Sequence, residues 1–385
     1  MPTLNPRHAD PKPADPNQSS VAQQYDVVII GAGLAGLTTA VVCRESGLDV
    51  CVLEAQSRIG GRVHSLYAQS GDALINNTHV ADLGPTWVWA KYQPHVQRWL
   101  QALEINLMPQ FERGQGMLDR DQNQHAEPWP LPGQDGMTRI NGGPQSIINA
   151  LCARLPSGTV HTNCPVSAIS AEHKQLKITA DSCEVLARHV VVATPLPIAA
   201  QSITFSPALP EAMTQQMQNT ATWMAQQAKV VIQYADAFWR ERGLSGRIAS
   251  QVGPLVEAHD HCATNGSPAA LFGFMGVPYS VREQHRQELP SAISTQLVRV
   301  FGESAPEPQH IHIEDWANNA WICSRDEQTG GGQHPSALAK ITREAFMQDR
   351  LHFAVSETST ISPGLIEGAL HAGESTAQRI IKGRQ

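Results

Sequence analysis

Short apolar runs alternate along the chain with glycine-rich turns and amphipathic stretches, and this pattern predicts alternating strands and helices. Residues 27–30 form an apolar run typical of a buried parallel strand, and residues 34–46 continue as a helix that Gly47 ends. A second apolar run at residues 50–53 predicts the next strand, with Glu54 at its end. Strand, helix and strand in this order predict a βαβ unit within a parallel sheet.

The turn at residues 31–36 has the glycine spacing that is needed to hold a dinucleotide. Gly31 permits the tight turn, Gly33 lets the backbone approach a pyrophosphate, and Gly36 lets the helix pack close to the strand. The free N–H groups of the helix start would then face the phosphates. Glu54 lies where a carboxylate accepts both hydrogen bonds from an adenosine ribose. A turn with only a structural role is the alternative.

Residues 55–62 narrow the choice of dinucleotide. They place a second glycine pair, together with Arg58 and Arg62, just beyond the predicted ribose carboxylate. A simple nicotinamide domain does not need these residues, whereas an arginine fork can neutralise a pyrophosphate bidentately. This arrangement favours FAD with its flavin pointing into a second domain.

Four segments resemble, in order, motifs of the flavin-containing amine oxidase family, the group that includes the monoamine and polyamine oxidases. They are the ribose and diphosphate motif at residues 53–62, the segment beside the isoalloxazine ring at 82–87, the strand with the active-site lysine at 228–239, and the C-terminal flavin motif at 353–369. The resemblance spans about Tyr25 to Ile381 and is that of a short bacterial-type member.

The resemblance implies FAD as cofactor and assigns contacts with it to fifteen residues: Gly31, Gly33, Gly36, Glu54, Ala55, Arg62, Gly84, Pro85, Thr86, Trp87, Val166, Glu357, Gly364, Leu365 and Ile366. It implies that Lys229 is catalytic, holding a water against flavin N5 and assisting the reaction with oxygen. The residues alone leave a second interpretation open, in which Lys229 is a strand-end lysine that reaches solvent.

The reaction implied by the resemblance is oxidation of a small amine. A hydride passes from a C–H next to the amine nitrogen to flavin N5, water hydrolyses the resulting imine, and dioxygen reoxidises the flavin with release of hydrogen peroxide. The helix that begins after Gly364 could stabilise negative charge on the reduced ring with its free N–H groups.

Three positions depart from the family pattern. The covalent flavin cysteine falls on Arg325, and the two cage tyrosines fall on Asp326 and Leu365, so FAD is expected to be held non-covalently. Asp326 could pair with a cationic substrate or merely with Arg325, and Trp321 could replace one aromatic wall or be a core residue. Trp321, Asp326 and Leu365 are therefore the candidate substrate residues. The missing cage also favours an alternative function, a flavin-binding partner protein or non-amine desaturase that has lost oxidase activity.

The predicted fold class is α/β, with a doubly wound, Rossmann-like FAD-binding domain of the GR2 type and a second α+β substrate domain on a mixed sheet. The FAD-binding domain is expected at residues 25–95, 137–205 and 325–385, the substrate domain at 96–136 and 206–324, and a disordered tail at 1–24. Within these domains, the sequence pattern predicts a helix over residues 94–108, a loop over 111–136 and an irregular stretch before Ser267.

Composition excludes several partners. The 28 basic and 35 acidic residues give a net charge of −7, which leaves no electrostatic footprint for nucleic acid or an anionic membrane. No apolar run reaches the roughly 18 residues that span a bilayer. The seven cysteines are scattered and odd in number, which favours free thiols in a reducing cytoplasm. His310 with His312, and residues 257–262, are weak metal candidates without a fourth ligand, and no metal is expected.

Overall fold

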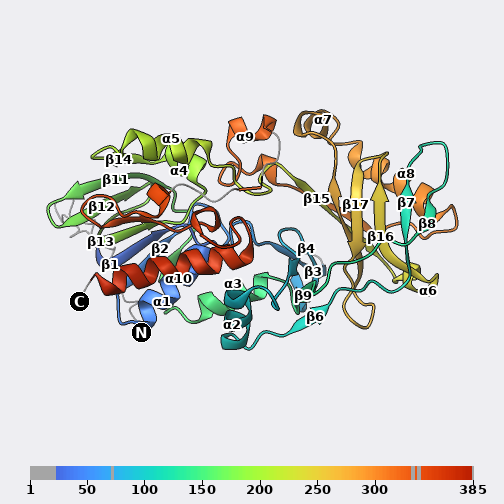
Figure 1. The fold of residues 1–385 in the computed structure, drawn as a ribbon, viewed down its shortest axis with the longest axis horizontal. Helices are drawn as coiled ribbons and strands as arrows, with labels where there is room; N and C mark the ends of the chain where they lie inside the picture. Colours follow the sequence, from blue (N-terminus) through green and yellow to red (C-terminus); the bar gives the residue numbers. More distant parts are fainter. Residues whose placement is uncertain (1–22, 71–72, 331–333, 336–339, 384–385) are drawn as a thin grey trace, which may run out of the picture.

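The computed structural model describes residues 23–70, 73–330, 334–335 and 340–383. Residues 1–22 of the expected tail lie outside the described residues, whereas Gln23 and Gln24 open the first strand, β1 (Gln23–Ile30). The molecule is elongated, with one sheet towards each end and smaller elements between them (Figure 1).

The first sheet has eight strands, and its centre is parallel. Its order is β10 (Val160–His161), β2 (Val50–Leu53), β1, β13 (Glu184–Val192), β12 (Gln175–Ala180), β11 (Val166–Glu172) and β14 (Thr204–Ser206), with β20 (Leu351–Phe353) also paired to β13. β2, β1, β13 and β20 run parallel, while β12 is antiparallel to both of its neighbours.

Helices cover both faces of this sheet. α1 (Leu34–Glu45), α3 (Gln145–Ala153) and α10 (Ile366–Lys382) lie on one face, and α4 (Leu196–Ser202) and α5 (Glu211–Asn219) lie on the other (Figure 1). Val27 and Ile29 of β1 belong to the first hydrophobic core, whereas Val28 and Ile30 belong to the second. Burial of both faces explains why β1 is an unbroken apolar run instead of an alternating one.

The second sheet has seven strands and is mixed. Its order is β19 (His310–Asp315), β15 (Ala228–Tyr234), β18 (Ala269–Met275), β17 (Leu255–Asp260), β16 (Leu244–Ser250), β7 (Gln115–Asp119) and β8 (Glu127–Trp129). Only β16 and β7 pair in parallel. A third core joins this sheet to α6 (Phe238–Glu241) and α8 (Leu289–Phe301). The two sheets confirm the predicted class, a Rossmann-like domain with a second domain on a mixed sheet.

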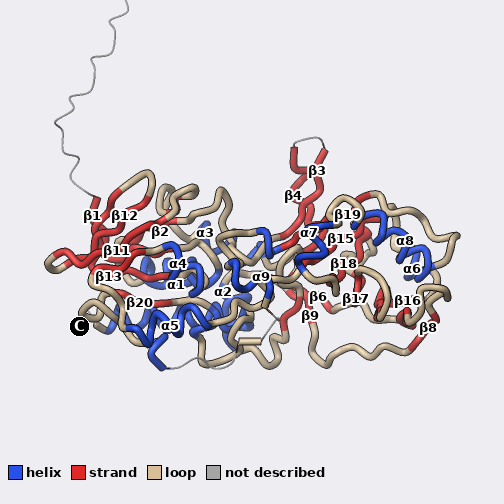
Figure 2. The backbone as a smooth tube through the Cα atoms, turned by 90° about the horizontal axis from the view of Figure 1, so that it is seen from above, coloured by secondary structure: helices blue, strands red, loops and turns tan. Residues whose placement is uncertain are grey.

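Smaller elements connect the two sheets. They are the hairpin β3 (Ser65–Ser70) and β4 (Ala73–Asp82), the three strands β5 (Trp87–Val88), β6 (Leu107–Pro109) and β9 (Thr138–Ile140), the helices α2 (Pro94–Ala102), α7 (Tyr279–Gln284) and α9 (Arg325–Thr329), and the 3-10 turns Trp316–Asn318, Lys340–Arg343 and Ser356–Thr358. The β3–β4 hairpin projects from the middle of the molecule in Figure 2. The expected boundary between residues 95 and 96 falls inside α2, which packs in the first core.

Three segments differ from the prediction. The helix expected over residues 94–108 ends at Ala102, because Glu104 takes a left-handed conformation (φ 57°) and the chain continues into β6. The loop expected over 111–136 contains β7 and β8, and the irregular stretch before Ser267 contains β16 and β17. These strands mix apolar and polar residues without a regular alternation, so pairing within the sheet, and not local periodicity, makes them strands.

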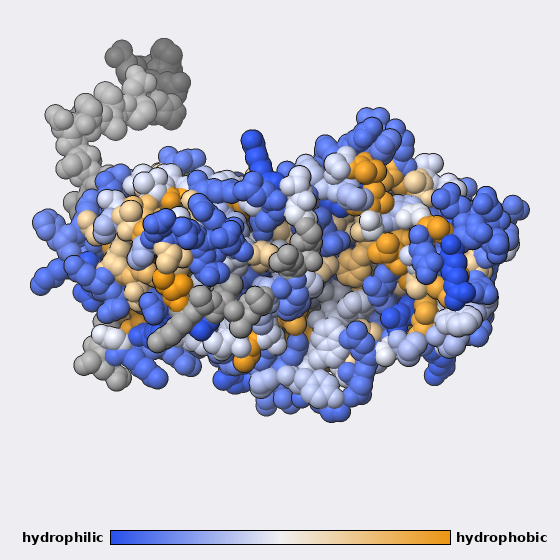
Figure 3. Space-filling view, turned by 45° about the horizontal axis from the view of Figure 1, so that its top comes forward, coloured by the Kyte–Doolittle hydropathy of each residue, from blue (hydrophilic) through white to orange (hydrophobic). Residues whose placement is uncertain are grey.

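On the face drawn in Figure 3, hydrophilic residues cover most of the surface at both ends, and hydrophobic residues show only in small separate patches. Among the described residues, no helix is both long enough and apolar enough to cross a membrane.

Candidate active site

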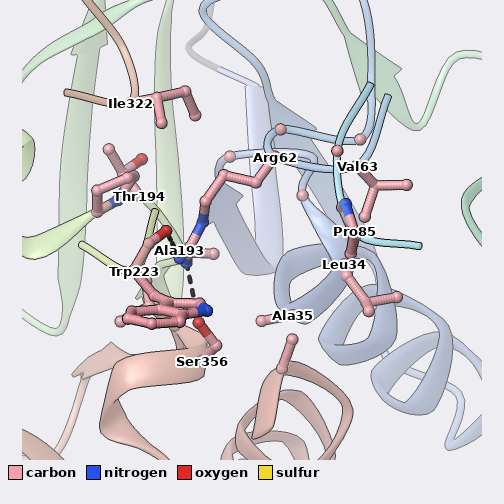
Figure 4. Close-up of a pocket in the computed structure, with 18 of the residues that line it drawn as sticks. Leu34, Ala35, Arg62, Val63, Pro85, Ala193, Thr194, Trp223, Ile322 and Ser356 are labelled. Carbon is pink, nitrogen blue, oxygen red and sulfur yellow. Dashed lines mark hydrogen bonds between the residues drawn. The ribbon is translucent and has the colours of Figure 1, made fainter. Parts of the chain in front are cut away.

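A cavity of about 400 Å³ brings together segments from the whole length of the chain. This volume lies within the range of about 300–1,000 Å³ that small-molecule sites occupy. The β1–α1 turn, the end of β2, residues 60–63 and 83–87, the start of β15 and the start of α10 all contribute to its wall. Figure 4 shows part of it, with Arg62 extended between Trp223 and Ser356.

The glycine turn shapes one end of the cavity as predicted. Gly31 has φ 107°, and a Cβ there would lie 2.9 Å from the Ala193 carbonyl oxygen. A Cβ on Gly36 would lie 2.1 Å from the Gly31 oxygen, so Gly36 keeps α1 close to β1. Gly33 differs, because a Cβ there would find its nearest neighbour 4.0 Å away and would instead project into open space.

The start of α1 is free to hold an anion. No side chain of the described residues caps its N-cap, Gly33, and its first turn contains no acidic residue. Leu34 and Ala35 of that turn line the cavity, so unpaired N–H groups and the positive end of the helix dipole face it. A pyrophosphate is the kind of group that fits this cradle.

Glu54 is fixed beside the turn by backbone hydrogen bonds. Its Oε2 accepts from the Ala32 N–H at 2.7 Å, and its Oε1 accepts from the Gln56 N–H at 2.8 Å. The carboxylate is buried yet lines the cavity, and each oxygen keeps a lone pair for a further donor. This geometry suits a ribose diol.

Arg62 forms an ion pair with the buried carboxylate of Glu357 across 295 positions of the chain. Its guanidinium donates to both Glu357 oxygens, at 2.6 and 2.9 Å, and to the Ser356 Oγ at 2.9 Å. Burial by itself raises the pKa of the Glu357 carboxyl, but the charge and hydrogen bonds of Arg62 outweigh burial and hold that pKa below its usual range. Arg62 lines the cavity, while Glu357 supports it from behind.

Arg58 does not join this fork. Its guanidinium donates to the carbonyl oxygens of Ile59, Gly61 and Val63 and lies 5.7 Å from the ring centre of Trp316. These contacts shape the loop, and Arg58 is not among the residues that line the cavity.

Lys229 lies at the other end of the cavity and is 3% exposed. Its Nζ donates to the Gly84 carbonyl oxygen at 2.7 Å and to the Thr86 Oγ1, and it lies 4.2 Å from the ring centre of Phe272. Burial lowers the pKa of Lys229 to about 7. The interpretation of Lys229 as a lysine that reaches solvent is therefore wrong.

Residues 84–87 are held against the lysine by close packing. A Cβ on Gly84 would lie 2.2 Å from the Arg62 carbonyl oxygen. The Trp87 Nε1 donates to the Gln110 Oε1 at 2.9 Å, and its ring meets Phe272 edge to face with centres 5.1 Å apart. This segment therefore contacts both the ion-paired arginine and the lysine.

The start of α10 forms another part of the wall. Gly364 has φ 82°, and a Cβ there would lie 2.7 Å from the Trp223 Cβ. No side chain of the described residues caps Leu365 at this N-terminus, and Leu365 and Ile366 line the cavity. The carboxylate of Glu367 instead accepts from the backbone N–H groups of His95 and Val96, so it caps the start of α2 and not that of α10.

Fifteen of the predicted site residues line the cavity: Gly31, Gly33, Glu54, Ala55, Arg62, Gly84, Pro85, Thr86, Trp87, Val166, Lys229, Trp321, Gly364, Leu365 and Ile366. Three do not. Gly36 packs α1 on β1, Glu357 holds Arg62, and Asp326 is exposed on α9 next to the equally exposed Arg325.

Sequence reasoning missed Trp89 and Trp223, which also line the cavity. Both lie in connecting segments without periodicity, and Met224 beside Trp223 has φ 60°. One signal was present: five of the eight tryptophans, at positions 87, 89, 223, 316 and 321, line this one cavity. Two of these tryptophans also pack in hydrophobic clusters, Trp316 within one and Trp87 against another, so the cavity wall and the cores share these rings.

The metal candidates do not form a site. Within the described residues, no group of three or more histidine, cysteine, aspartate or glutamate side chains is arranged to hold a metal ion. Residues 257–262 begin in β17 and are not a loop, and the Asp260 carboxylate is bound by Arg240 and Trp239.

Comparisons with known proteins agree with one another on the family of this chain. The profile described as flavin containing amine oxidoreductase matches residues 124–381, and that of an NAD(P)-binding Rossmann-like domain matches residues 29–103. A flavin-containing amine oxidase of Oncorhynchus mykiss is 24% identical over 461 residues, covering 93% of this chain and 86% of its own length. Flavin-containing amine oxidase B of Homo sapiens is 23% identical over 463 residues, covering 94% and 87%.

Solved structures show the same fold. Wild-type putrescine oxidase bound to putrescine has a TM-score of 0.76 at 19% identity, and cyclohexylamine oxidase from Brevibacterium oxydans has a TM-score of 0.77 at 20% identity. Each match covers 94% of this chain and 99% of the other. The profile match covers more than half of the chain, and it confirms the resemblance found in the sequence. The chain belongs to the family of flavin-containing amine oxidoreductases.

Proposed function

We propose that this protein is an FAD-dependent oxidoreductase that oxidises a small amine with dioxygen as electron acceptor. One observation carries the proposal: the uncapped start of α1, the fixed Glu54 carboxylate, the ion-paired Arg62 and the buried Lys229 all face one cavity. The residues present fit FAD, because open space at Gly33 leaves room for a pyrophosphate and Glu54 retains acceptors for the ribose.

Different residues of the cavity would bind different parts of FAD. The α1 turn and Arg62 would hold the pyrophosphate, Glu54 the adenosine ribose, and residues 84–87 with the start of α10 the ring. Bound FAD would supply an acceptor for the hydride from the C–H beside the amine nitrogen, and dioxygen would return it to the oxidised form with release of hydrogen peroxide. Lys229 would hold a water at its Nζ and donate a hydrogen bond towards the reacting edge.

We infer that FAD is held without a covalent bond. The position of the family's flavin-bearing cysteine is taken by Arg325, which is exposed on α9. Cys323 is buried, and its Sγ donates to the Ser324 carbonyl oxygen. The one cysteine among the described cavity residues is Cys164, whose N–H donates to the Glu54 carbonyl oxygen at the ribose end.

The cavity favours an apolar monoamine over a diamine. Among the described residues that line it, Glu54 is the only carboxylate, and it lies at the ribose end. A second ammonium group would find no carboxylate at the ring end, where Trp87, Trp321 and Leu365 contribute to the wall. A substrate with an apolar body next to a neutral amine nitrogen would pack well against this apolar wall.

Anaerobic bleaching of the yellow protein by a panel of amines tests the proposal. Apolar monoamines should remove the absorbance of oxidised flavin, and admission of air should restore it with release of hydrogen peroxide. If a diamine bleaches the protein and apolar monoamines do not, the substrate class is wrong. If no amine bleaches it although a reductant does, the alternative of a flavin-binding protein without amine oxidation is correct.

We also propose that the protein works in the cytoplasm. All seven cysteines are free thiols and four of them, at positions 43, 51, 262 and 323, have pKa values that burial raises to about 12. Structural thiols of this kind suit a reducing compartment.

A further inference from the structure

Two thiols lie close together at the ribose end of the cavity, and the proposed chemistry leaves them without a role. The Sγ atoms of Cys164 and Cys183 are 3.7 Å apart, although 19 positions separate the two residues in the chain. Cys164 precedes β11, and Cys183 lies between β12 and β13. Because β11 and β12 pair antiparallel, with Val166 opposite Ala180, the pairing brings both cysteines to the same end of these strands.

The two thiols differ in their access to solvent. Cys164 is 3% exposed and forms part of the cavity wall. Cys183 is half-buried, and its chain neighbours Ser182 and Glu184 are exposed. A dissolved oxidant therefore meets Cys183 first, and Cys164 lies behind it as a second thiol.

Backbone hydrogen bonds hold the two turns that carry these thiols. The Cys164 N–H donates to the Glu54 carbonyl oxygen at 2.8 Å, and the Ala180 N–H donates to the Cys183 carbonyl oxygen at 2.9 Å. The Cys164 Sγ also lies 3.4 Å from the Ser182 Oγ, in the turn of Cys183. The thiols thus face each other from two turns that are each fixed within the first sheet.

A disulfide between them requires a small movement that the cavity would sense. Its S–S bond is about 2.05 Å long, so the two Sγ atoms must approach from 3.7 Å by about 1.7 Å. Any share of this approach that Cys164 takes moves the turn whose N–H is bonded to Glu54. Glu54 is the proposed ribose ligand, so the disulfide and the ribose compete for the position of this turn.

Hydrogen peroxide, the proposed product, is an oxidant that can form this bond. The Cys183 sulfur attacks one peroxide oxygen, the O–O bond breaks, and a sulfenic acid and one water result. The Cys164 thiol then attacks the Cys183 sulfur, the S–O bond breaks, and a second water leaves as the disulfide forms. In total the two thiols lose two electrons and two protons, and one peroxide becomes two waters.

The first step is slow at neutral pH. Burial, and after it the hydrogen bond with Cys164, raises the pKa of the Cys183 thiol, and the thiolate is the form that reacts. The pair should therefore respond to accumulated peroxide and not to each turnover. A thiol reductant in the surroundings reverses the reaction, which is typical of disulfides that act as sensors in reducing compartments.

We propose that Cys164 and Cys183 form a peroxide-sensitive thiol pair, and that their disulfide weakens the binding of FAD at the ribose end. The inference rests on the proposed function for the place of FAD and for the source of the peroxide. Added hydrogen peroxide replaces turnover in the experiment, so the thiol pair and the amine oxidation can fail separately.

Peptide mapping of the holoenzyme treated with hydrogen peroxide detects the disulfide directly. Trypsin cleaves after Lys174 and Lys177, so the two cysteines fall in different peptides, residues 155–174 and 178–188. After free thiols are alkylated, peroxide treatment should yield these two peptides joined, and dithiothreitol should separate them.

Three variants assign the roles of the thiols. Cys183→Ser should abolish the link. In Cys164→Ser the sulfenic acid at Cys183 has no second thiol and should be trapped by dimedone. Cys152→Ser is the matched control, because Cys152 is also partly exposed but lies on α3, and this variant should form the link as wild type does.

Equilibrium dialysis of the holoenzyme measures the effect on the cofactor. Peroxide should weaken FAD binding by about two- to tenfold, the range that corresponds to one hydrogen bond, and dithiothreitol should restore it. Cys183→Ser should bind FAD as tightly as reduced wild type, and peroxide should leave its affinity unchanged.

A reversible link between the two peptides together with weaker FAD binding supports the proposal. Three results would overturn it: no link after peroxide treatment, a link from Cys183 to the buried Cys51 in place of Cys164, or equal FAD affinity in the oxidised and reduced protein. If Cys164→Ser does not fold, Cys183→Ser decides alone. If the disulfide forms with the expected loss of affinity while no amine is oxidised, the proposed function fails and the thiol pair stands.

Discussion

The two ends of the cavity are built in different ways. At the ribose end, Glu54 is held by the N–H groups of Ala32 and Gln56, which lie 22 and two positions away in the chain. At the ring end, Lys229 is held by Gly84 and Thr86, which lie 145 and 143 positions away in the chain. One end is a local backbone motif, and the other is an assembly of groups from separate elements.

This difference determines how each end of the cavity responds to substitution. At the ribose end the donors are backbone N–H groups, so only substitution of Glu54 itself removes these hydrogen bonds, and other substitutions there act mainly by filling space in the cavity. Buried charges brought from distant segments remain ionised only while every partner is present, so removal of one partner leaves another uncompensated.

The largest effect is expected at the Arg62–Glu357 ion pair, whose carboxylate is buried. Arg62→Met leaves the Glu357 carboxylate, which is 2% exposed, without its cation and should lower the free energy of unfolding by about 3–5 kcal/mol. Urea denaturation measures this change. Arg44→Met removes an exposed pair with Asp49 and serves as the control, with an expected loss of no more than about 1 kcal/mol. Equal losses in the two variants would show that Arg62 and Glu357 do not act as a buried pair.

The second prediction concerns the pH dependence of stability at Lys229. Burial lowers its pKa to about 7 in the folded protein from 10.5, so between these values the unfolded chain binds more protons. Stability contributed by this group therefore rises with pH, and the cost of the buried charge is fully present below pH 7. Lys229→Met removes this cost. The difference in the free energy of unfolding between the variant and wild type should therefore shrink by on the order of 2–3 kcal/mol between pH 6 and pH 9.

Unfolding by urea at both pH values measures this difference between the variant and wild type. Lys177→Met is the control, because the Lys177 ammonium is outside the cavity and pairs with Glu184 across a surface strand pair. If the difference in the free energy of unfolding between the variant and wild type stays constant from pH 6 to pH 9, Lys229 remains charged over this whole range.

The same contrast explains what could be predicted from the sequence. The βαβ unit at the ribose end was predicted to the residue over β2, because glycine spacing, an apolar run and a terminal acid are all local signals. The partner of Arg62 and the contact between Asp82 and His261 were not, since nothing near Asp82 in the sequence indicates a partner 179 positions away. The strands β7, β8, β16 and β17 were missed for the same reason, as they are specified by pairing and not by their own pattern.

A smaller effect is expected when space at the ribose end is filled. Gly33→Ala is compatible with the backbone, because φ is −75° and the nearest neighbour of the added Cβ would lie 4.0 Å away, so stability should be unchanged or rise by less than about 1 kcal/mol. The methyl group would occupy the space assigned to the pyrophosphate and should weaken FAD binding about tenfold, or about 1.4 kcal/mol.

Fluorescence titration of the protein with FAD measures the affinity. Gly383→Ala is a suitable control, since Gly383 has φ −67° and lies at the far end of α10. Unchanged affinity in Gly33→Ala would mean that the phosphates do not bind at the α1 turn.

The smallest effect is expected at Asp326, which belongs to neither end of the cavity. Its carboxylate is exposed on α9, so Asp326→Asn should change stability by less than about 0.5 kcal/mol and the KM for an amine by less than about twofold. Trp321→Ala is the comparison, because Trp321 lines the cavity and loss of its ring should raise KM severalfold by removing apolar contact worth about 1 kcal/mol. A rise in KM in Asp326→Asn that exceeds the rise in Trp321→Ala would reverse this order. It would place the cation-recognising group on α9, outside the cavity that both ends share.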